Sequence, residues 1–197
     1  MFGLFRTKPN YAKIFASQDE VRKYLYTDRT KTSFILGDNN FINAWLDSSN
    51  SDTVTAVIKA EALNGDIPSL KQMIWLLECY YQDAPNHFKS DALLLEARTS
   101  FLQDRIKYCQ KAIEYGLKDQ SYYAMTSSVK LYNLYQSIPN SINNPNLQMS
   151  VLGIIMFAEM YINSGLGESE LIQDSKDAIT YYTPIANLVV SMVDINT

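Results

Sequence analysis

Residues 94–116 read LLEARTSFLQDRIKYCQKAIEYG and make the longest amphipathic helix pattern in the chain. Their apolar side chains fall on two adjoining lines, which together give one wide apolar face. Gly116 lies where a residue in the left-handed conformation ends such a helix. A face this wide needs neighbours on two sides, so we expect this helix to be central. The first line is Leu94, Phe101, Tyr108 and Tyr115, and the second is Leu95, Leu102, Ile106, Cys109 and Ile113.

Similar patterns extend over most of the chain and predict an all-α fold. We expect about eight helices in stacked antiparallel hairpins, an α-solenoid-like arrangement. Residues 27–40 are predicted to be a connector with a brief extended piece, and residues 83–86 a turn around Pro85. Pro184 is expected to kink or split the last helix. The other helices are predicted at residues 18–26, 41–46, 52–63, 66–82, 119–137 and 147–162, with a less regular turn at 11–15.

The chain has 197 residues, enough for one sizeable core and few for two independent ones. We therefore predict a single domain with three parts. Residues 1–50 supply N-terminal helices and a connector, 51–137 the repeat-like hairpins, and 146–197 a C-terminal apolar hairpin.

Charge is distributed unevenly along the chain, although the formal net charge is only -4. Residues 1–31 hold seven Lys or Arg against three acids, whereas residues 137–197 hold one lysine against six acids. The two ends attract each other, are simply solvated, or leave an acidic surface for a basic partner. Nucleic acid is disfavoured as that partner, because a pI near 5.0 is far from the basic footprint that phosphate binding requires.

The longest apolar run is residues 151–158, and Glu159 closes it. It is far shorter than the roughly 18 residues of a spanning helix. The N-terminal residues lack the features of a signal peptide, so we predict a cytoplasmic protein that does not cross a membrane. Cys79 and Cys109 lie in apolar helix patterns without metal-ligand spacing, and we expect buried free thiols.

Two helix ends share a pattern. Residues 61–66 read EALNGD and residues 112–116 read AIEYG, and each glycine precedes an apolar helix rich in tyrosine. This pattern resembles the Sel1-like branch of the tetratricopeptide-type (TPR) repeats, over residues 52–136. The resemblance implies a stack of antiparallel helix pairs that presents a surface to another protein.

The sequence carries no motif for catalysis, for a metal or for a cofactor, and we predict none of the three. His87 and Asp91 form a pair four residues apart, but two ligands do not make a zinc site. The glycines at 165 and 167 lack the lysine of a phosphate loop. Glu78 is the carboxylate whose burial would raise its pKa into the range of an acid or base catalyst. The helical period instead predicts that it lies on an exposed strip with Lys71 and Gln82.

Tyrosine outnumbers phenylalanine fourteen to eight, and half-buried tyrosines are common at protein interfaces. We look for a partner-binding face where aromatic residues fall on otherwise polar strips, near acids of the C-terminal region. Such a face would serve a partner or a second copy equally well. The predicted partner-binding residues are Trp75, Glu78, Tyr123, Tyr132, Tyr135, Glu168, Glu170, Asp174 and Asp177.

These observations favour a protein that acts by binding another protein. Our first hypothesis is a small cytosolic inhibitor, of the kind represented by bacterial immunity proteins that neutralise a toxin by stoichiometric binding. A cationic toxin domain would be steered to the acidic C-terminal half and anchored by aromatic side chains. The alternatives are a Sel1-like adaptor or scaffold and, third, an enzyme that uses Glu78 or another acid.

Overall fold

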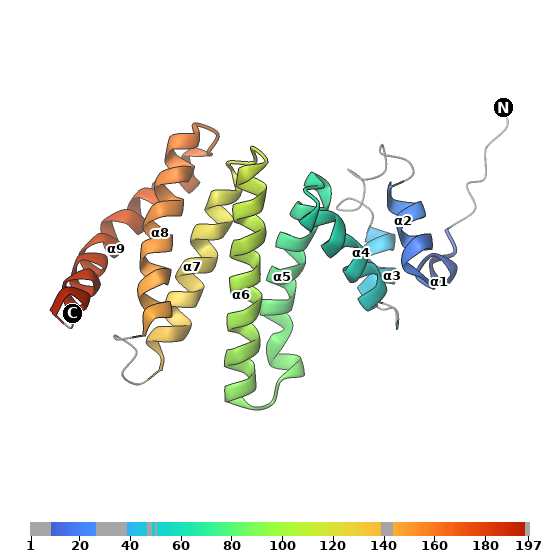
Figure 1. Ribbon diagram of the computed structural model, residues 1–197, viewed down its shortest axis with the longest axis horizontal. Coiled ribbons are helices and arrows are strands. Elements are labelled where there is room, and N and C mark those ends of the chain that lie inside the picture. The colour runs from blue at the N-terminus through green and yellow to red at the C-terminus, as the bar shows by residue number, and fades with distance from the viewer. Residues whose placement is uncertain (1–8, 27–38, 47–48, 50, 139–143, 196–197) are drawn as a thin grey trace. The chain divides into compact units, whose positions relative to one another are not determined.

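The computed structural model describes residues 9–26, 39–46, 49, 51–138 and 144–195. These residues form nine helices and no strand, which confirms the all-α prediction. Figure 1 labels the helices in chain order. They are α1 (Tyr11–Ile14), α2 (Gln18–Tyr26), α3 (Asn39–Leu46), α4 (Ser51–Leu63), α5 (Ile67–His87), α6 (Asp91–Glu114), α7 (Gln120–Gln136), α8 (Pro145–Ser164) and α9 (Ser169–Ile195).

The chain divides into two compact units, Met1–Gln72 (unit 1) and Met73–Thr197 (unit 2). The division falls inside α5. The expectation of a single domain is therefore not confirmed, and the solenoid arrangement remains a prediction. The connector predicted at residues 27–40, with its extended piece, lies mostly outside the described residues.

Unit 1 is built on an aromatic cluster from its first three helices. Phe15, Phe41 and Trp45 are almost fully buried, and the rings of Phe15 and Phe41 meet edge to face at 5.5 Å. The Trp45 indole donates its N–H to the carbonyl of Ser51 at 3.2 Å, which ties α3 to the start of α4. Large rings give a short chain segment much buried area, and the indole hydrogen bond satisfies the polar group of Trp45.

Unit 2 is a series of helices in which each packs on the next. α6 contacts α7, α7 contacts α8, and α8 contacts α9, and α6, α7 and α8 run in alternating directions (Figure 1). α6 also meets α5, where the rings of Phe101 and Tyr80 lie 5.6 Å apart. The wide apolar face of α6 thus has the two neighbours that its pattern predicts. Its buried residues are Leu102, Arg105, Tyr108, Cys109 and Ala112.

The two similar helix ends have the same backbone structure. Gly65 and Gly116 have φ of 91° and 92°. In each case the glycine N–H donates to the carbonyl three residues back, and the next residue donates to the carbonyl five residues back. This is the Schellman motif, which satisfies the last carbonyls of a helix and needs a left-handed residue. The shared sequence pattern therefore specifies a shared turn.

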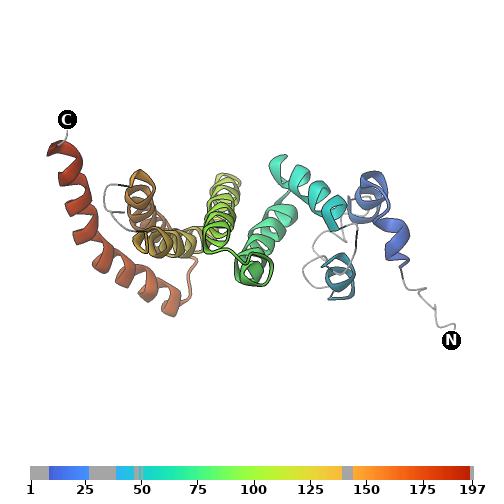
Figure 2. The same cartoon turned by 90° about the horizontal axis from the view of Figure 1, so that it is seen from below.

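Two prolines lie inside helices, and neither ends its helix. α5 continues through Pro85 to His87, because the Asp83 carboxylate bonds Asn86 at 2.6 Å and His87 at 2.7 Å and holds the last turn. The predicted turn at residues 83–86 is therefore wrong, and His87 is the last residue of α5. α9 also continues through Pro184, so the split that was one of the two expected outcomes does not occur, and Figure 2 shows α9 as one curved helix.

Candidate functional site

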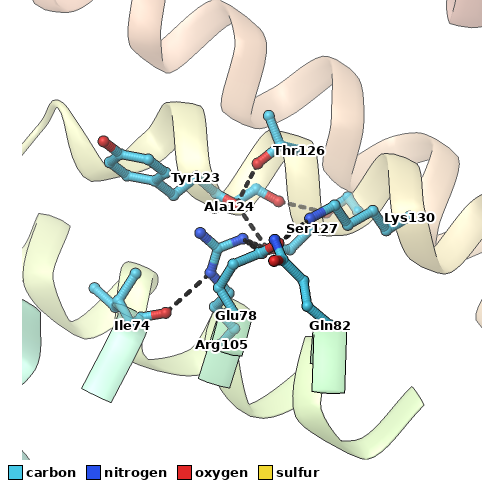
Figure 3. A network of polar contacts seen from close by, with 10 residues as sticks. Ile74, Glu78, Gln82, Arg105, Tyr123, Ala124, Thr126, Ser127 and Lys130 are labelled. Atoms are coloured by element: carbon cyan, nitrogen blue, oxygen red, sulfur yellow. Dashed lines mark hydrogen bonds and ion pairs between the residues drawn. The ribbon is translucent and has the colours of Figure 1, made fainter. Parts of the chain in front are cut away.

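The Glu78 carboxylate lies at the centre of a charge network that joins α5, α6 and α7 (Figure 3). Arg105 Nη1 lies 2.5 Å from Oε2, Lys130 Nζ donates to Oε1, and Gln82 Nε2 donates to the same oxygen at 2.8 Å. The side chains of Glu78 and Arg105 are only 17% and 7% exposed. The prediction of an exposed strip is therefore wrong for Glu78, because side chains from α6 and α7 cover the carboxylate.

Arg105 joins the same three helices through further contacts. Its Nε donates to the Ile74 carbonyl and its Nη1 to Ser127 Oγ, both at 3.1 Å. The Tyr123 ring lies over its guanidinium, 5.6 Å from Cζ to the ring centre. Arg105 was not among the residues predicted from the sequence. Its signal was its position three residues after Leu102 and four before Cys109, on the buried side of α6, where a cation is buried only with partners.

These contacts fix the ionisation state of Glu78. Burial raises the pKa of this carboxyl, but the hydrogen bonds from Lys130 and Gln82 and the charge of Arg105 lower it further than burial raises it. The net pKa lies below the ordinary value of a glutamic acid. Glu78 is thus an ionised, paired carboxylate at neutral pH. This is the opposite of the raised pKa that would suit it to general acid catalysis.

The predicted aromatic residues have different surroundings. Tyr132 is buried against the ring of Tyr182, with the centres 5.2 Å apart, and Tyr135 is buried with its hydroxyl accepting from Gln103 at 3.1 Å. Trp75 is half-buried. Tyr123 is 42% exposed, so among the four predicted aromatic residues it has the clearest access to solvent.

The four predicted acids, Glu168, Glu170, Asp174 and Asp177, are all exposed at the start of α9. The last three follow one line of the helix, and four residues further along the same line comes Tyr181, which is 65% exposed. Asp174 accepts a hydrogen bond from the Tyr122 hydroxyl at 3.0 Å, which links α9 to α7. This acidic line, Glu170, Asp174, Asp177 and Tyr181, combines negative charge with an aromatic side chain that the sequence reasoning did not select.

A groove of about 510 Å³ lies between α6, α7 and α8. Ile106 and Leu131 are among its apolar lining residues, and α8 supplies Met149, Leu152 and Met156. These three α8 side chains are exposed, as is Met160 one turn further on. We call Met149, Leu152, Met156 and Met160 the outer stripe of α8.

α8 has the length and the apolar composition of a helix that could cross a membrane. No other helix among the described residues has both. Its composition has a second explanation in its two faces. Val151, Ile154, Ala158 and Tyr161 are buried, whereas the outer stripe faces away from them. The apolar composition of α8 is thus shared between a buried face and an exposed one.

The described residues contain no group of three or more His, Cys, Asp or Glu side chains placed to hold a metal ion. His87 is exposed and pairs with Asp83 rather than with the predicted Asp91. Cys109 is buried as predicted, and burial raises the pKa of its thiol to about 12. Cys79 is only half-buried, and both cysteines are free.

No protein-family model, curated protein or solved structure matches the chain.

Proposed function

We propose that this protein acts by binding another protein, through unit 2. The observation that carries the proposal is the groove between α6, α7 and α8 with the exposed outer stripe of α8. Four large apolar side chains on successive turns are exposed next to a depression that has room for several side chains. Exposed apolar surface of this kind marks interaction sites, and methionine adapts easily to the shape of a partner.

The acidic line on α9 supports a basic partner. Its three carboxylates are exposed, and Lys176 is the only basic residue in residues 137–197. An acidic surface raises the association rate of a cationic protein, and Tyr181 supplies an amphipathic ring of the kind that anchors interfaces. Glu78, Tyr132 and Tyr135 drop out of the proposed interface, because their polar groups or rings are already engaged within unit 2.

Within this class we favour a small cytoplasmic inhibitor that neutralises one basic toxin or effector domain by stoichiometric binding. An inhibitor needs a stable surface and no chemistry of its own. The apolar groove and the acidic line together suit one partner that has both apolar and basic features. Electrostatic steering also increases the rate at which an acidic inhibitor associates with a basic toxin. A high association rate suits an inhibitor, which must bind the toxin before the toxin acts.

A Sel1-like adaptor is the second candidate, and the paired helix ends favour it. Gly65 and Gly116 end their helices with the same hydrogen bonds and nearly the same φ, as successive units of a repeat would. An adaptor would bind several partners more weakly, whereas an inhibitor binds one partner tightly.

Co-purification of the native protein from cells that express the adjacent genes, followed by mass spectrometry, tests the proposal. We expect one basic protein in a one-to-one complex. A variant with Glu170→Gln, Asp174→Asn and Asp177→Asn should associate more slowly and lose much of the salt dependence of association. The amide at position 174 can still accept the Tyr122 hydrogen bond, so the fold should persist. Several weakly bound proteins would favour the adaptor, and no partner at all would contradict both.

A further inference from the structure

The outer stripe of α8 has the geometry of a docking site for a helix. Met149, Leu152, Met156 and Met160 follow spacings of three, four and four residues and are all exposed. At 1.5 Å per residue the stripe is about 16 Å long, or about three helical turns. A small molecule would fill part of the groove and leave the far end of the stripe in water. A helix lying along α8 would cover it from end to end.

The groove has an apolar floor because α7 and α8 approach closely. A Cβ atom at Gly153 would lie 3.2 Å from Ser128 Oγ, so this position leaves little space for a side chain. The Ser128 hydroxyl donates to the Ala124 carbonyl at 2.9 Å and does not present an unsatisfied group to an occupant. Leu131 and Ile106 line the groove beside this contact. The floor therefore suits apolar side chains rather than a polar ligand.

The charges around the groove are arranged along its length. Glu159 lines it, and Glu114 lies one turn beyond the lining residue Gln110 on α6. Because α6 and α8 run in the same direction, these two acids, near the C-terminal ends of their helices, lie at the same end of the groove (Figure 1). α7 runs the opposite way, so the partial positive charge of its N-terminal end offsets part of the partial negative charge of the two helix ends, and the carboxylates themselves supply the negative charge. Of the nearby lysines on α6, Lys107 is paired with Asp104 at 3.3 Å, and Lys111 lies over the Tyr115 ring, 6.0 Å from Nζ to the ring centre. Glu159 is the only charged side chain among the described residues that line the groove, so the end at which it lies is negative.

We propose that the groove binds an amphipathic helix of the partner protein, with the partner's basic residues at the end marked by Glu114 and Glu159. This inference rests on the proposed function and names the element that the partner contributes. The apolar side of the helix covers the outer stripe of α8. Its N-terminal end, with its partial positive charge and the basic residues before it, lies at the negative end of the groove.

Charge complementarity distinguishes this occupant from two others. A second copy that docked through the same groove about a two-fold axis would bring its own Glu159 to the same surface, whereas the excess of basic residues in the chain lies in residues 1–31. An anionic lipid surface would be repelled by the same carboxylates. A helix with a basic end gains from them.

Two fluorescent peptides of about four turns test the proposal. Both carry leucines at a helical spacing, and they differ only in having lysines or glutamates just before the helix. Anisotropy titrations at low salt should give the lysine peptide at least about tenfold higher affinity. Met156→Lys should weaken its binding by at least about tenfold, and Glu159→Lys should remove most of the preference between the peptides. Leu93→Lys, at an exposed position outside the groove, is the control and should leave binding unchanged.

Equal affinity of the two peptides, or binding unaffected by Met156→Lys, would overturn the inference. A dimer that Met156→Lys converts to a monomer in sedimentation would assign the groove to a second copy. Binding to phosphatidylcholine vesicles that Met156→Lys abolishes would assign it to lipid. The proposed function fails separately. If a co-purified partner binds the Met156→Lys variant normally, the inference about the groove is wrong and the proposed function stands. If the lysine peptide binds the groove but no partner co-purifies from cells, the proposed function alone is contradicted.

Discussion

Two neighbouring regions of unit 2 differ in whether their side chains are already engaged within the chain. In the Glu78 network, one carboxylate is paired with two cations, and the three side chains come from three helices and meet in a largely buried position. In the groove and the outer stripe of α8, large apolar side chains remain in water. The two regions are adjacent on α6, where Arg105 enters the network and the next residue, Ile106, lines the groove.

The comparison shows that the charges of the network have a structural role, whereas the apolar stripe is surface that a partner can cover. Glu78 has the chemistry of a functional residue, but its bonds are made within the chain and its contribution is to hold α5, α6 and α7 together. The methionines of α8 have no reactive chemistry, yet they are the groups whose burial would release free energy. At roughly 25 cal/mol per Å² of apolar surface, a partner gains more from covering this stripe than from competing for a paired carboxylate.

The largest expected effect comes from breaking the network at Arg105. Arg105→Met keeps much of the volume but leaves Glu78 with one cation and removes the donors to Ile74 and Ser127. We expect a loss of about 3 kcal/mol in the free energy of unfolding, measured by urea denaturation. Arg98→Met is the matched control on the same helix, where the guanidinium lies over Tyr81 at 5.1 Å, and it should cost only about 1 kcal/mol. Equal losses would mean that the ion pair adds nothing specific.

The two faces of α8 give the next contrast. Ile154 is fully buried, and Ile154→Ala should cost about 3 kcal/mol through lost burial and the cavity left behind. Met156 lies two residues away and is exposed, so Met156→Ala should change the free energy of unfolding by less than about 0.5 kcal/mol. The same urea measurement compares them. A large loss in Met156→Ala would show that the outer stripe is packed within the folded chain and is not free for a partner.

A smaller effect is expected at Gly116, which ends the helix shared by both regions. With φ of 92°, an alanine there is strained although no atom lies within 4 Å of the added Cβ. Gly116→Ala should destabilise unit 2 by about 1 kcal/mol and leave peptide binding to the groove intact. Calorimetry and the anisotropy titration measure the two effects. Loss of binding at unchanged stability would place Gly116 in the site itself.

The smallest effect is a pH dependence of the network. Because the pKa of Glu78 is lower in the folded state, its contribution to stability is present above the unfolded value of about 4.3 and is lost as the pH falls through the folded pKa. Thermal unfolding from pH 6 down to pH 3 should therefore show a steeper loss for the wild type than for Glu78→Gln. Parallel curves would indicate that Glu78 has the same pKa in both states.

The sequence predicted where most helices lie along the chain, but not which side chains the contacts between helices would cover. The repeat of about 3.6 residues and the glycine stops are local signals, so α2, α6, α7 and α8 begin and end close to their expected residues. Pro85 misled the prediction because the Asp83 side chain holds the turn that proline weakens. The acids of α9 are exposed, which agrees with two of the three alternatives that the charge distribution left open, plain solvation and an acidic surface for a partner.

Three residues predicted at the surface are engaged within the chain instead: Glu78, Tyr132 and Tyr135. To place them correctly, one must know which helices contact one another. Glu78 shares its side of α5 with Lys71 and Gln82, and periodicity alone makes that side polar. It became the centre of a network only because Arg105 and Lys130 come from helices 27 and 52 residues further along the chain. Tyr132 and Tyr135 are covered in the same way, by Tyr182 from α9 and Gln103 from α6.

By itself the sequence determined an all-α chain, its glycine-ended turns and its acidic C-terminal half, because each depends on neighbouring residues or on composition. Only the tertiary structure decided which charges are neutralised and which apolar side chains stay exposed. A helix has one periodicity but several neighbours, and the burial of a side chain depends on the distant helix placed against it. Leu152 and Val151 are adjacent apolar residues in the sequence, and packing alone buries one and leaves the other in the groove.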